Sequence, residues 1–483
     1  MIHDYEIVSG LEVHAQLLTK TKLFCGDTTS FGQMPNTQVS AISLGHPGTL
    51  PRLNAEAIYL AVKIGLACNC TIVQHNFFAR KNYFYPDLPK GYQVTQHTAP
   101  ICKNGFIEIV TGGINKRIRL NRIHIEEDAG KSIHNEKNAF SDLDYNRAGM
   151  PLLEIVTEPD IRSAEEAFAF VSTLRKLVRH LGVCDGNMEE GSFRCDVNIS
   201  LRKKGDAQLG TRVEVKNLNS LRFIRKSIEH ESVRLAELLE KGESILQQTR
   251  GFNENDFTTY AIRTKEDEDD YRYFPEPDLP PIYLDDETIE KIRMEMPASQ
   301  QAIKSKLVNE FKLSDYDASQ LADDSELSSF FLELTHSTGN FKSAANWVSG
   351  PIKNHLQKNE IIISDSGLKA ASVSKLISLI DEGNISHGVA VQQILPVMFD
   401  EPDLDVEQFI KENDLGLQTN TDDLENWVNN ALTKHAQKIP EYKKGKKGLL
   451  SVFVGEVMKL SKGRADAQLV TKIIIKKINN TDE

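Results

Sequence analysis

Apolar and polar residues alternate through much of the first half of the chain, a pattern that predicts β-strands. Every second side chain is apolar in LEVHAQL at residues 11–17, in FRCDVNISL at 193–201 and in the shorter TRVEVK at 211–216. Because successive side chains of a strand point to opposite faces, each segment is expected to bury one face and expose a polar one. The last two segments flank a short turn, which predicts an antiparallel pair.

Helical periodicity appears between these predicted strands. Ser163 and Glu166 have the spacing of a capping box, and apolar residues recur at helical spacing from there to Gly182. A second helix is predicted over residues 220–241, where apolar side chains share one side and a glycine follows. Strands and helices that intermix in this way predict an α+β domain built on an antiparallel sheet.

A change of composition divides the chain. Prolines crowd residues 275–281, and from about residue 295 the alternation gives way to helical spacing. Residues 401–405 have the composition of a linker. We therefore expect an α+β domain over 1–293, an all-α helical domain over 294–402 and a small helical tail domain over 403–483.

Composition narrows the class of protein. The chain of 483 residues has 69 acidic and 57 basic residues, a formal charge of −12, and 40% hydrophobic residues. These values are typical of globular domains and exclude a disordered or uniformly basic chain. Because no segment has the roughly 18–20 apolar residues of a membrane-spanning helix, we expect no membrane and a cytoplasmic location. Six scattered cysteines predict free thiols rather than a disulfide scaffold.

Positive charge is concentrated near the C-terminus. Between Lys434 and Lys477 there are twelve lysines and arginines against three acids, although the whole chain is acidic. A run of lysines usually means only a solvated helical surface, but a separation of charge this marked favours a surface that binds phosphates.

Carboxylates and an imidazole occupy polar positions of the predicted strands. Glu12 and His14 are two residues apart, so they project from one face with Cα atoms about 6.7 Å apart. Glu126 and Glu127 stand at the end of another predicted strand, and Glu154 lies inside an apolar run. Clustered carboxylates repel one another unless a cation neutralises them, and oxygen ligands favour Mg²⁺. The plain alternative for each is a solvated strand face or turn.

Three further segments have a suggestive composition. Basic and aromatic residues mix in RKNYFYPDLPKGYQ at 80–93, which suits phosphate binding and base stacking but also packing before a proline turn. GNMEEGSFRCDVNISLR at 186–202 adds acids and amides to a polar sheet face. The ending GKS at 130–132 imitates a phosphate-binding P-loop, but that motif requires glycine where the chain has Ile125, so it is rejected.

Six segments, in order, carry a family resemblance: GLEVHAQL, FARKNYFYPDLPKGYQ, HIEEDAGKS, AGMPLLEIVTEPDIRS, MEEGSFRCDVNISLR and DYRYFPEPDLPP. Together they resemble the B-type subunit of the aspartyl/glutamyl-tRNA(Asn/Gln) amidotransferase family, from near residue 5 to the C-terminus. The resemblance implies a glutamine-synthetase-like cradle domain, a helical domain and a tRNA-binding tail. It also implies three kinds of partner: an amidase that releases ammonia from glutamine, a small third subunit that braces the complex, and Glu-tRNA(Gln) and/or Asp-tRNA(Asn).

The chemistry implied by this resemblance is that of an ATP-dependent carbon–nitrogen ligase with glutamine as amido donor. ATP phosphorylates the side-chain carboxylate of the amino acid esterified to tRNA, and ammonia then displaces the phosphate to give Gln or Asn. Phosphoryl transfer depends mainly on positioning and charge neutralisation, so ATP and Mg²⁺ are the expected cofactors.

The resemblance also assigns site residues. Matched motif to motif, His14, Glu127 and Glu154 are the implied metal ligands, and Glu12 is a catalytic residue that lies near the metal or binds it through water. Further contacts to nucleotide, acyl phosphate or ammonia are implied for Lys81, Arg194, Asp196 and Lys216.

The choice between two neighbouring glutamates depends on where a strand ends. Strict alternation from Ile123 would place Glu126 on the same face as His124 and turn Glu127 away. The family assignment instead requires the strand to end at Ile125, and we adopt it with Glu126 as the alternative.

One loop departs from the family pattern. Many relatives carry a zinc-type C-x-C followed by C-x-x-C, and the matching positions here are Cys25, Asp27, Ser40 and Ser43. Because one thiol of four remains, no zinc is expected.

Two other functions compete with this ligase. One is a tRNA-binding scaffold without its own active site, which is disfavoured because the acids concentrate far in sequence from the basic tail. The other is a free-standing ATP-dependent ligase acting on a small carboxylic acid, which is disfavoured because it would not need a basic helical appendage.

Overall fold

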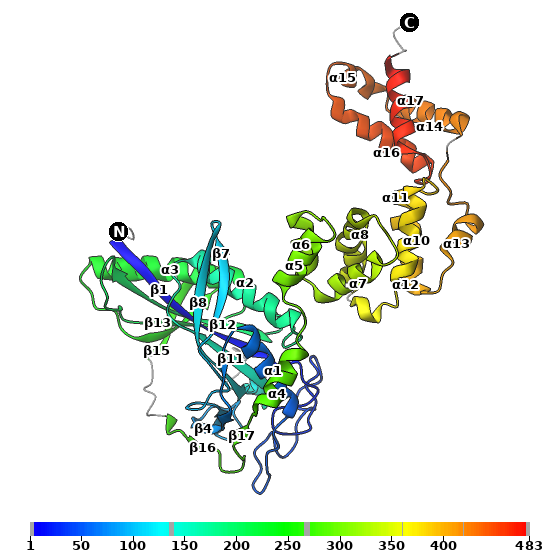
Figure 1. The fold of residues 1–483 in the computed structure, drawn as a ribbon. Helices are drawn as coiled ribbons and strands as arrows, with labels where there is room; N and C mark the ends of the chain where they lie inside the picture. Colours follow the sequence, from blue (N-terminus) through cyan, green and yellow to red (C-terminus); the bar gives the residue numbers. More distant parts are fainter. Residues whose placement is uncertain (1–3, 135–139, 265–270, 360, 419, 480–483) are drawn as a thin grey trace. The chain divides into compact units, whose positions relative to one another are not determined.

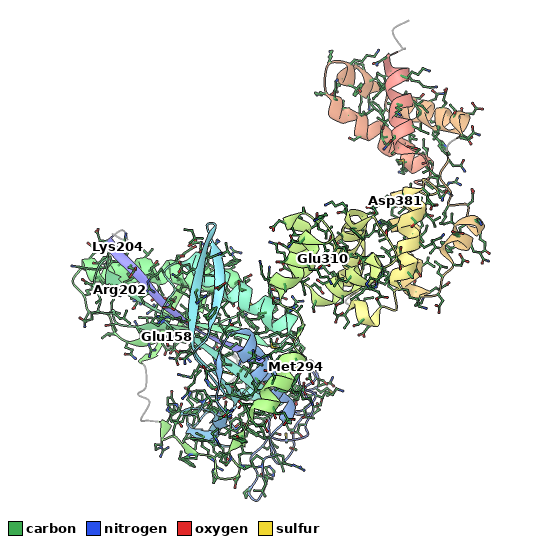
Figure 2. The ribbon with its side chains drawn as sticks, viewed as in Figure 1. Glu158, Arg202, Lys204, Met294, Glu310 and Asp381 are labelled. Carbon is green, nitrogen blue, oxygen red and sulfur yellow. The ribbon has the colours of Figure 1, made fainter. Side chains whose placement is uncertain are left out.

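The computed structural model describes residues 4–134, 140–264, 271–359, 361–418 and 420–479. The chain divides into two units, Met1–Pro297 and Ala298–Glu483. In Figure 2, Met294 marks the last helix of the first unit and Glu310 the end of the first helix of the second. Within the described residues, no helix combines the length and the apolar character needed to cross a membrane.

A large mixed sheet forms the centre of the first unit (Figure 1). Its strands follow the order β15-β14-β13-β12-β1-β11-β8-β5-β4-β16, and β6 and β7 also pair with β8. The strand bounds are β1 (Tyr5–Gln16), β4 (Ala79–Asn82), β5 (Tyr92–Thr95), β6 (Cys102–Lys103), β7 (Phe106–Thr111), β8 (Ile114–Glu127), β11 (Pro151–Thr157), β12 (Phe193–Lys203), β13 (Val213–Leu218), β14 (Gln248–Asn253), β15 (Thr258–Thr264) and β16 (Phe274–Pro275).

The sheet is mostly antiparallel, but it is not wholly so. The predicted pair of strands around the turn at 203–210 is confirmed, because β12 and β13 pair antiparallel. β13 and β14, however, pair in parallel, so the sheet is mixed where an antiparallel sheet was expected. Parallel neighbours need a long crossover, and α3 (Leu221–Glu240) supplies it between these two strands.

The two faces of the sheet differ in polarity, as the alternation predicted. On β1, Leu11, Val13 and Ala15 are buried in the apolar core, whereas Glu12 and His14 belong to the other face. The helices α1 (Ala55–Ala67), α2 (Ala164–His180) and α3 contribute to the same core (Figure 1). The helices therefore cover the apolar face of the sheet and leave its polar face for a site.

The predicted helix after Ser163 is confirmed, with one difference at its start. Ser163 Oγ accepts a hydrogen bond from Glu166 N at 3.1 Å, as a capping residue should. The Glu166 carboxylate accepts from Arg162 N at 2.7 Å rather than from Ser163 N, so the capping box is only half formed. Gly182 follows the helix with φ +64°, a conformation that glycine adopts without strain.

The second unit is helical, which confirms the helical spacing predicted from residue 295 onward. Residues 401–405, predicted as a linker, lie outside helices, between one helix that ends at Asp400 and another that begins at Val406. The longer helices described in the second unit are α5 (Gln300–Asn309), α6 (Asp315–Ala322), α7 (Ser325–Thr335), α8 (Phe341–Trp347), α9 (Lys353–Lys358), α10 (Ala370–Asp381), α12 (Leu395–Asp400), α13 (Val406–Glu412), α14 (Thr421–Lys434), α16 (Leu450–Leu460) and α17 (Ala467–Asn479).

This second unit contains separate apolar cores. One includes buried side chains from Leu307 to Leu415, and another is formed by α14, α16 and α17, from Leu424 to Ile478. The small C-terminal core is consistent with a tail module, while the domain boundaries at 293 and 402 stay predictions.

Candidate active site

A polar pocket of about 470 Å³ lies on the polar face of the sheet. Strands β1, β8, β11, β12 and β13 form its floor, and residues of β4 and β5 line it as well. The carboxylates that line it are Glu12, Glu126, Asp128, Glu154, Asp196 and Glu214. So many acids around one cavity require cations to neutralise them.

The strand register explains how residues distant in sequence meet here. His14 on β1 lies opposite Glu154 on β11, which in turn lies opposite His124 on β8. The next row of the sheet contains Arg122 on β8, and it reaches Glu12 on β1 by way of β11. Because paired residues of neighbouring strands share a face, each row points into the pocket.

A first cluster combines two imidazoles with two carboxylates. His14 Nε2 lies 3.5 Å from Glu154 Oε2 and 3.7 Å from Glu126 Oε1. His124 Nε2 lies 3.4 Å from Glu154 Oε2 and 3.6 Å from Glu126 Oε2. The ligand atoms of His14, Glu126 and Glu154 are close enough together to hold one metal ion. We call His14, His124, Glu126 and Glu154 the mixed cluster.

The charges of the mixed cluster are interdependent. Burial alone would lower the pKa of His14, but the hydrogen bond to Glu154 and the charge of Glu154 outweigh it and raise the pKa to about 9. Burial would likewise lower the pKa of His124, and the neighbouring carboxylates raise it to about 9. Burial would raise the pKa of Glu154, but the two imidazoles hold it well below its usual value. The imidazoles and the carboxylates of the cluster therefore favour each other's charged forms.

A second cluster contains only carboxylates. Glu12, Asp196 and Glu214 also present oxygen atoms close enough to share one ion, and we call them the carboxylate cluster. Lys216 Nζ lies 3.4 Å from both Asp196 Oδ2 and Glu214 Oε1. Burial opposes the charge of Lys216, but these carboxylates outweigh it and raise its pKa. The pKa of Glu12 is raised above its usual value, mainly by burial and next by the negative charge of Glu154.

Glu127 does not join the mixed cluster. The strand was expected to end at Ile125, but β8 continues through Glu127, which pairs with Pro151. Alternation therefore turns Glu126 into the pocket and Glu127 to the opposite face. There the Glu127 carboxylate accepts hydrogen bonds from Lys90 Nζ at 2.5 and 2.6 Å and from Val94 N at 2.8 Å.

The remaining predicted site residues line the same pocket. Arg194 Nη2 donates to Asp128 Oδ2 at 3.0 Å. Lys81 Nζ lies over the ring of Tyr271, 4.7 Å from its centroid. Tyr271 belongs to an aromatic wall that continues with Tyr273, whose ring lies 6.1 Å away. The structure thus brings Lys81 and Arg194 into the same pocket as the acids, and their roles stay predictions.

His124 and Glu214 were missed as site residues, although the sequence contained a signal for both. His124 is two residues from Glu126 and shares its face, and Glu214 stands at an outward position of the TRVEVK strand. Alternation alone could have found them, but only the strand order places them beside Glu154 and Asp196.

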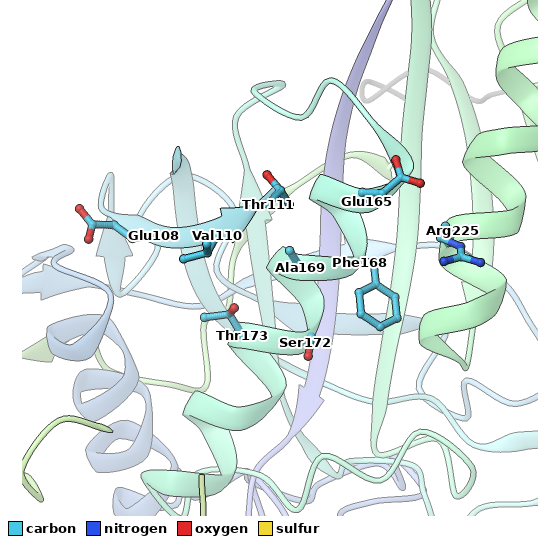
Figure 3. A pocket seen from close by; sticks show the side chains of 9 residues that line it. All are labelled: Glu108, Val110, Thr111, Glu165, Phe168, Ala169, Ser172, Thr173 and Arg225. Carbon is cyan, nitrogen blue, oxygen red and sulfur yellow. The ribbon is translucent and has the colours of Figure 1, made fainter. Parts of the chain in front are cut away.

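A second hollow lies on the helical side of the first unit (Figure 3). It has a volume of about 450 Å³ and is lined from β7, α2 and α3, with Phe168 and Val110 among its walls. Its charged side chains are Glu108, Glu165 and Arg225, and Arg225 is already 3.4 Å from Glu229. Because this hollow lacks converging titratable groups, the polar pocket is the better candidate for catalysis.

Comparison with known proteins agrees with this choice. Residues 7–290 match the family model described as "GatB/GatE catalytic domain", and residues 329–478 match the model described as "GatB domain". The chain belongs to the GatB family. All the residues of both clusters lie inside the match to the catalytic domain.

Full-length relatives of the GatB family are similar along nearly the whole chain. A protein from Thermodesulfovibrio yellowstonii is 43% identical over 473 residues, covering 98% of this chain and 99% of its own length. One from Geobacter sp. strain M21 is 44% identical over 480 residues, with coverages of 98% and 99%. One from Alkalilimnicola ehrlichii is 44% identical over 482 residues, with coverages of 99% and 100%. Each is named as the B-type subunit of an aspartyl/glutamyl-tRNA(Asn/Gln) amidotransferase.

Proposed function

We propose that this chain is the ligase subunit of a tRNA-dependent amidotransferase, acting with an amidase and a small third subunit. It converts Glu-tRNA(Gln), Asp-tRNA(Asn) or both to the amidated aminoacyl-tRNA. The observation that carries the proposal is the polar pocket with its two acidic clusters, inside the region that matches a catalytic domain. The names of the full-length relatives supply the substrate class.

The proposed reaction has two steps. First, an oxygen of the substrate's side-chain carboxylate attacks the γ-phosphorus of ATP; the bond to the bridging oxygen breaks, and ADP leaves with that electron pair. Next, ammonia attacks the acyl carbon, inorganic phosphate leaves, and the nitrogen gives up a proton to form the amide. Both steps move negative charge, so a pocket of cations and positioned donors suits them.

The donor sets of the two clusters fit divalent cations of different character. The carboxylate cluster of Glu12, Asp196 and Glu214 offers the oxygen ligands that Mg²⁺ prefers. The mixed cluster offers nitrogen and oxygen, a set that also accommodates Mn²⁺. A bound divalent cation would neutralise phosphate charge and orient the transferred group. Glu126 rather than Glu127 is our proposed ligand beside His14 and Glu154.

The pocket's own cations have separate proposed roles. Arg194 is held by Asp128 and would keep that wall of the pocket in place while contacting nucleotide. Lys216 neutralises the carboxylate cluster. When ATP binds, a cation would replace the Lys216 ammonium group beside these carboxylates. Lys81 lies over Tyr271, has no carboxylate partner within the described residues, and would contact the substrate's phosphoryl group.

The first unit would serve as the catalytic cradle and residues 403–483 as the tRNA-binding tail. Around α15 (Ile439–Lys443), the lysines 443, 444, 446 and 447 are exposed. Exposed lysines next to a small apolar core suit binding of an RNA backbone without sequence readout.

The test is a pair of glutamate-to-glutamine variants near one strand. Glu154→Gln removes a charge from the mixed cluster, whereas Glu158→Gln makes the same change just beyond β11, where Glu158 accepts from Asn121 Nδ2 (Figure 2). Each variant is assembled with its partner proteins, and amidation of Glu-tRNA(Gln) is measured with ATP and ammonium chloride, which bypasses glutamine hydrolysis.

We expect Glu154→Gln to lower amidation at least 100-fold and Glu158→Gln to remain within about threefold of the parent. Binding of tRNA and glutamine hydrolysis by the partner should be unchanged in both. Full amidation by Glu154→Gln at limiting Mg²⁺ would refute the assignment and favour a tRNA-binding scaffold instead.

A further inference from the structure

The cationic side chains of the polar pocket differ in how well they are paired. Among the described lining residues, Arg194 contacts Asp128, Lys216 contacts Asp196 and Glu214, and Lys81 lies over an aromatic ring. Arg122 differs from all three. Its guanidinium makes a long hydrogen bond, from Nη1 to Asn121 Oδ1 at 3.4 Å.

One nitrogen of Arg122 is both buried and unsatisfied. Arg122 Nε has no hydrogen-bond acceptor in the described structure, although the side chain lines a cavity rich in carboxylates. Leaving a donor of a charged group buried without a partner costs free energy that the fold would normally avoid. An unsatisfied guanidinium N–H beside a cavity therefore indicates an acceptor that binds there.

The position of Arg122 in the sheet indicates which acceptor this is. Arg122 lies opposite Val156, Val156 lies opposite Glu12, and Glu12 lies opposite Asp196. Arg122 thus lies in the row that leads to the carboxylate cluster. Arg122 and Glu12 are separated by two strand spacings, about 10 Å between Cα atoms, which a chain of phosphates can bridge.

Its chemistry also favours a phosphate. The planar guanidinium presents paired N–H donors that match two oxygens of one phosphate. An ATP whose cation is held by the carboxylate cluster would extend along this row toward Arg122.

We propose that Arg122 binds phosphate oxygens of ATP and stabilises the γ-phosphoryl group during its transfer to the substrate carboxylate. This inference rests on the proposed function and adds a residue to it. As the bond from the γ-phosphorus to ADP breaks and the bond to the carboxylate oxygen forms, negative charge spreads over the equatorial oxygens. A fixed guanidinium then donates to oxygens whose charge is increasing.

The test uses the complete complex with three substitutions of Arg122 and a matched control. Arg122→Gln removes the charge, Arg122→Lys keeps the charge but loses the paired donors, and Arg122→Ala leaves space for added guanidinium ion. Lys103→Gln removes one positive charge from β6 at the position directly opposite Arg122, where the side chain is exposed and does not line the pocket.

We expect Arg122→Gln to lower kcat/KM for ATP by about 100- to 1,000-fold. Binding of Mg²⁺-ATP without tRNA, measured by calorimetry, should weaken about tenfold. Arg122→Lys should recover only part of the loss, and guanidinium ion at a non-denaturing concentration should raise the rate of Arg122→Ala. Lys103→Gln should match the parent. If Arg122→Gln does not fold, the test is the activity of a folded Arg122→Lys, which should stay below that of the parent.

Three outcomes would overturn the inference. The first is an ATP affinity and kcat/KM for ATP in Arg122→Gln that equal those of the parent. The second is an equal loss in Lys103→Gln, which would indicate a general effect of charge. The third is weakened tRNA binding with unchanged ATP binding, which would make the ligand an RNA phosphate. Glu154→Gln separates this failure from failure of the proposed function, because it should remain inactive if only the role of Arg122 is wrong.

Discussion

The structure predicts that replacing glutamate by glutamine has different effects at the neighbouring residues Glu126 and Glu127. Glu126 faces the two histidines of the polar pocket, and Glu127 faces Lys90 on the other side of β8. Replacing either glutamate by glutamine preserves its shape and removes one charge. We expect Glu127→Gln to lower stability and Glu126→Gln to lower the affinity for divalent cations.

The expected size of the Glu127 effect follows from its burial. The side chains of Glu127 and Lys90 are 4% and 14% exposed, and the carboxylate also accepts from Val94 N. Removing one partner of a buried pair typically costs about 3–5 kcal/mol in the free energy of unfolding. For a unit of this size, that loss lowers the unfolding temperature by on the order of 10 °C. A double variant, Lys90→Met with Glu127→Gln, should recover part of it, because neither charge is then left unpaired.

The expected size of the Glu126 effect is small for stability and large for metal binding. Neutralising Glu126 removes its repulsion with Glu154 along with its attraction to the imidazoles, so the unfolding temperature should change by less than about 3 °C. Loss of a direct ligand should weaken divalent cation binding by at least roughly 10- to 100-fold, the range that follows loss of an outer-shell partner of a ligand.

Thermal unfolding with and without Mn²⁺ measures both effects in the same samples. A bound cation raises the unfolding temperature by mass action, so the Mn²⁺-induced rise should persist in full in Glu127→Gln and become smaller in Glu126→Gln, where the carboxylate cluster is intact. An unchanged unfolding temperature in Glu127→Gln, together with loss of the Mn²⁺-induced rise, would show that Glu127 is the ligand after all.

Three other predictions concern separate parts of the chain. Elemental analysis should find no zinc, because Cys25 is the one thiol at the matching positions and Asp27 already accepts from Ser43 Oγ at 2.6 Å; one zinc per chain, lost on Cys25→Ser, would contradict this. Truncation after Asp405 should weaken tRNA binding and reduce its log–log salt slope by roughly 0.7–0.9 for each lost phosphate contact, whereas an unchanged slope would make the tail an assembly element. Ser163→Ala should lower the free energy of unfolding by about 1 kcal/mol through loss of the α2 cap, as chemical denaturation would show.

Local patterns in the sequence predicted the faces of the sheet well. Alternation in residues 11–17 identified the buried side chains of β1 and the polar side that carries Glu12 and His14. Ser163 and Gly182 bounded a helix that the structure confirms. These features depend on interactions within a few residues, so they can be predicted without knowledge of the fold.

The order of the strands could not be read in the same way. Nothing local to β13 or β14 indicates that they are parallel, because that choice follows from how α3 packs against the sheet. For the same reason, acidic residues of the site could be identified from the sequence, but their division into two clusters could not. Glu214 joins Glu12 and Asp196 only because β12 lies between β13 and β1.

Glu127 shows why a partner distant in sequence can decide the meaning of a local pattern. A glutamate that ends a strand facing the apolar side violates the alternation, and its burial is costly unless the charge is paired. The violation is tolerated because Lys90, 37 positions earlier in the chain, donates to the Glu127 carboxylate and supplies a positive charge on that face of the sheet. Once that charge is present, β8 can continue to Glu127, and Glu126 must then face His14 and Glu154. The position of one lysine outside the polar pocket thus determines which carboxylate enters it.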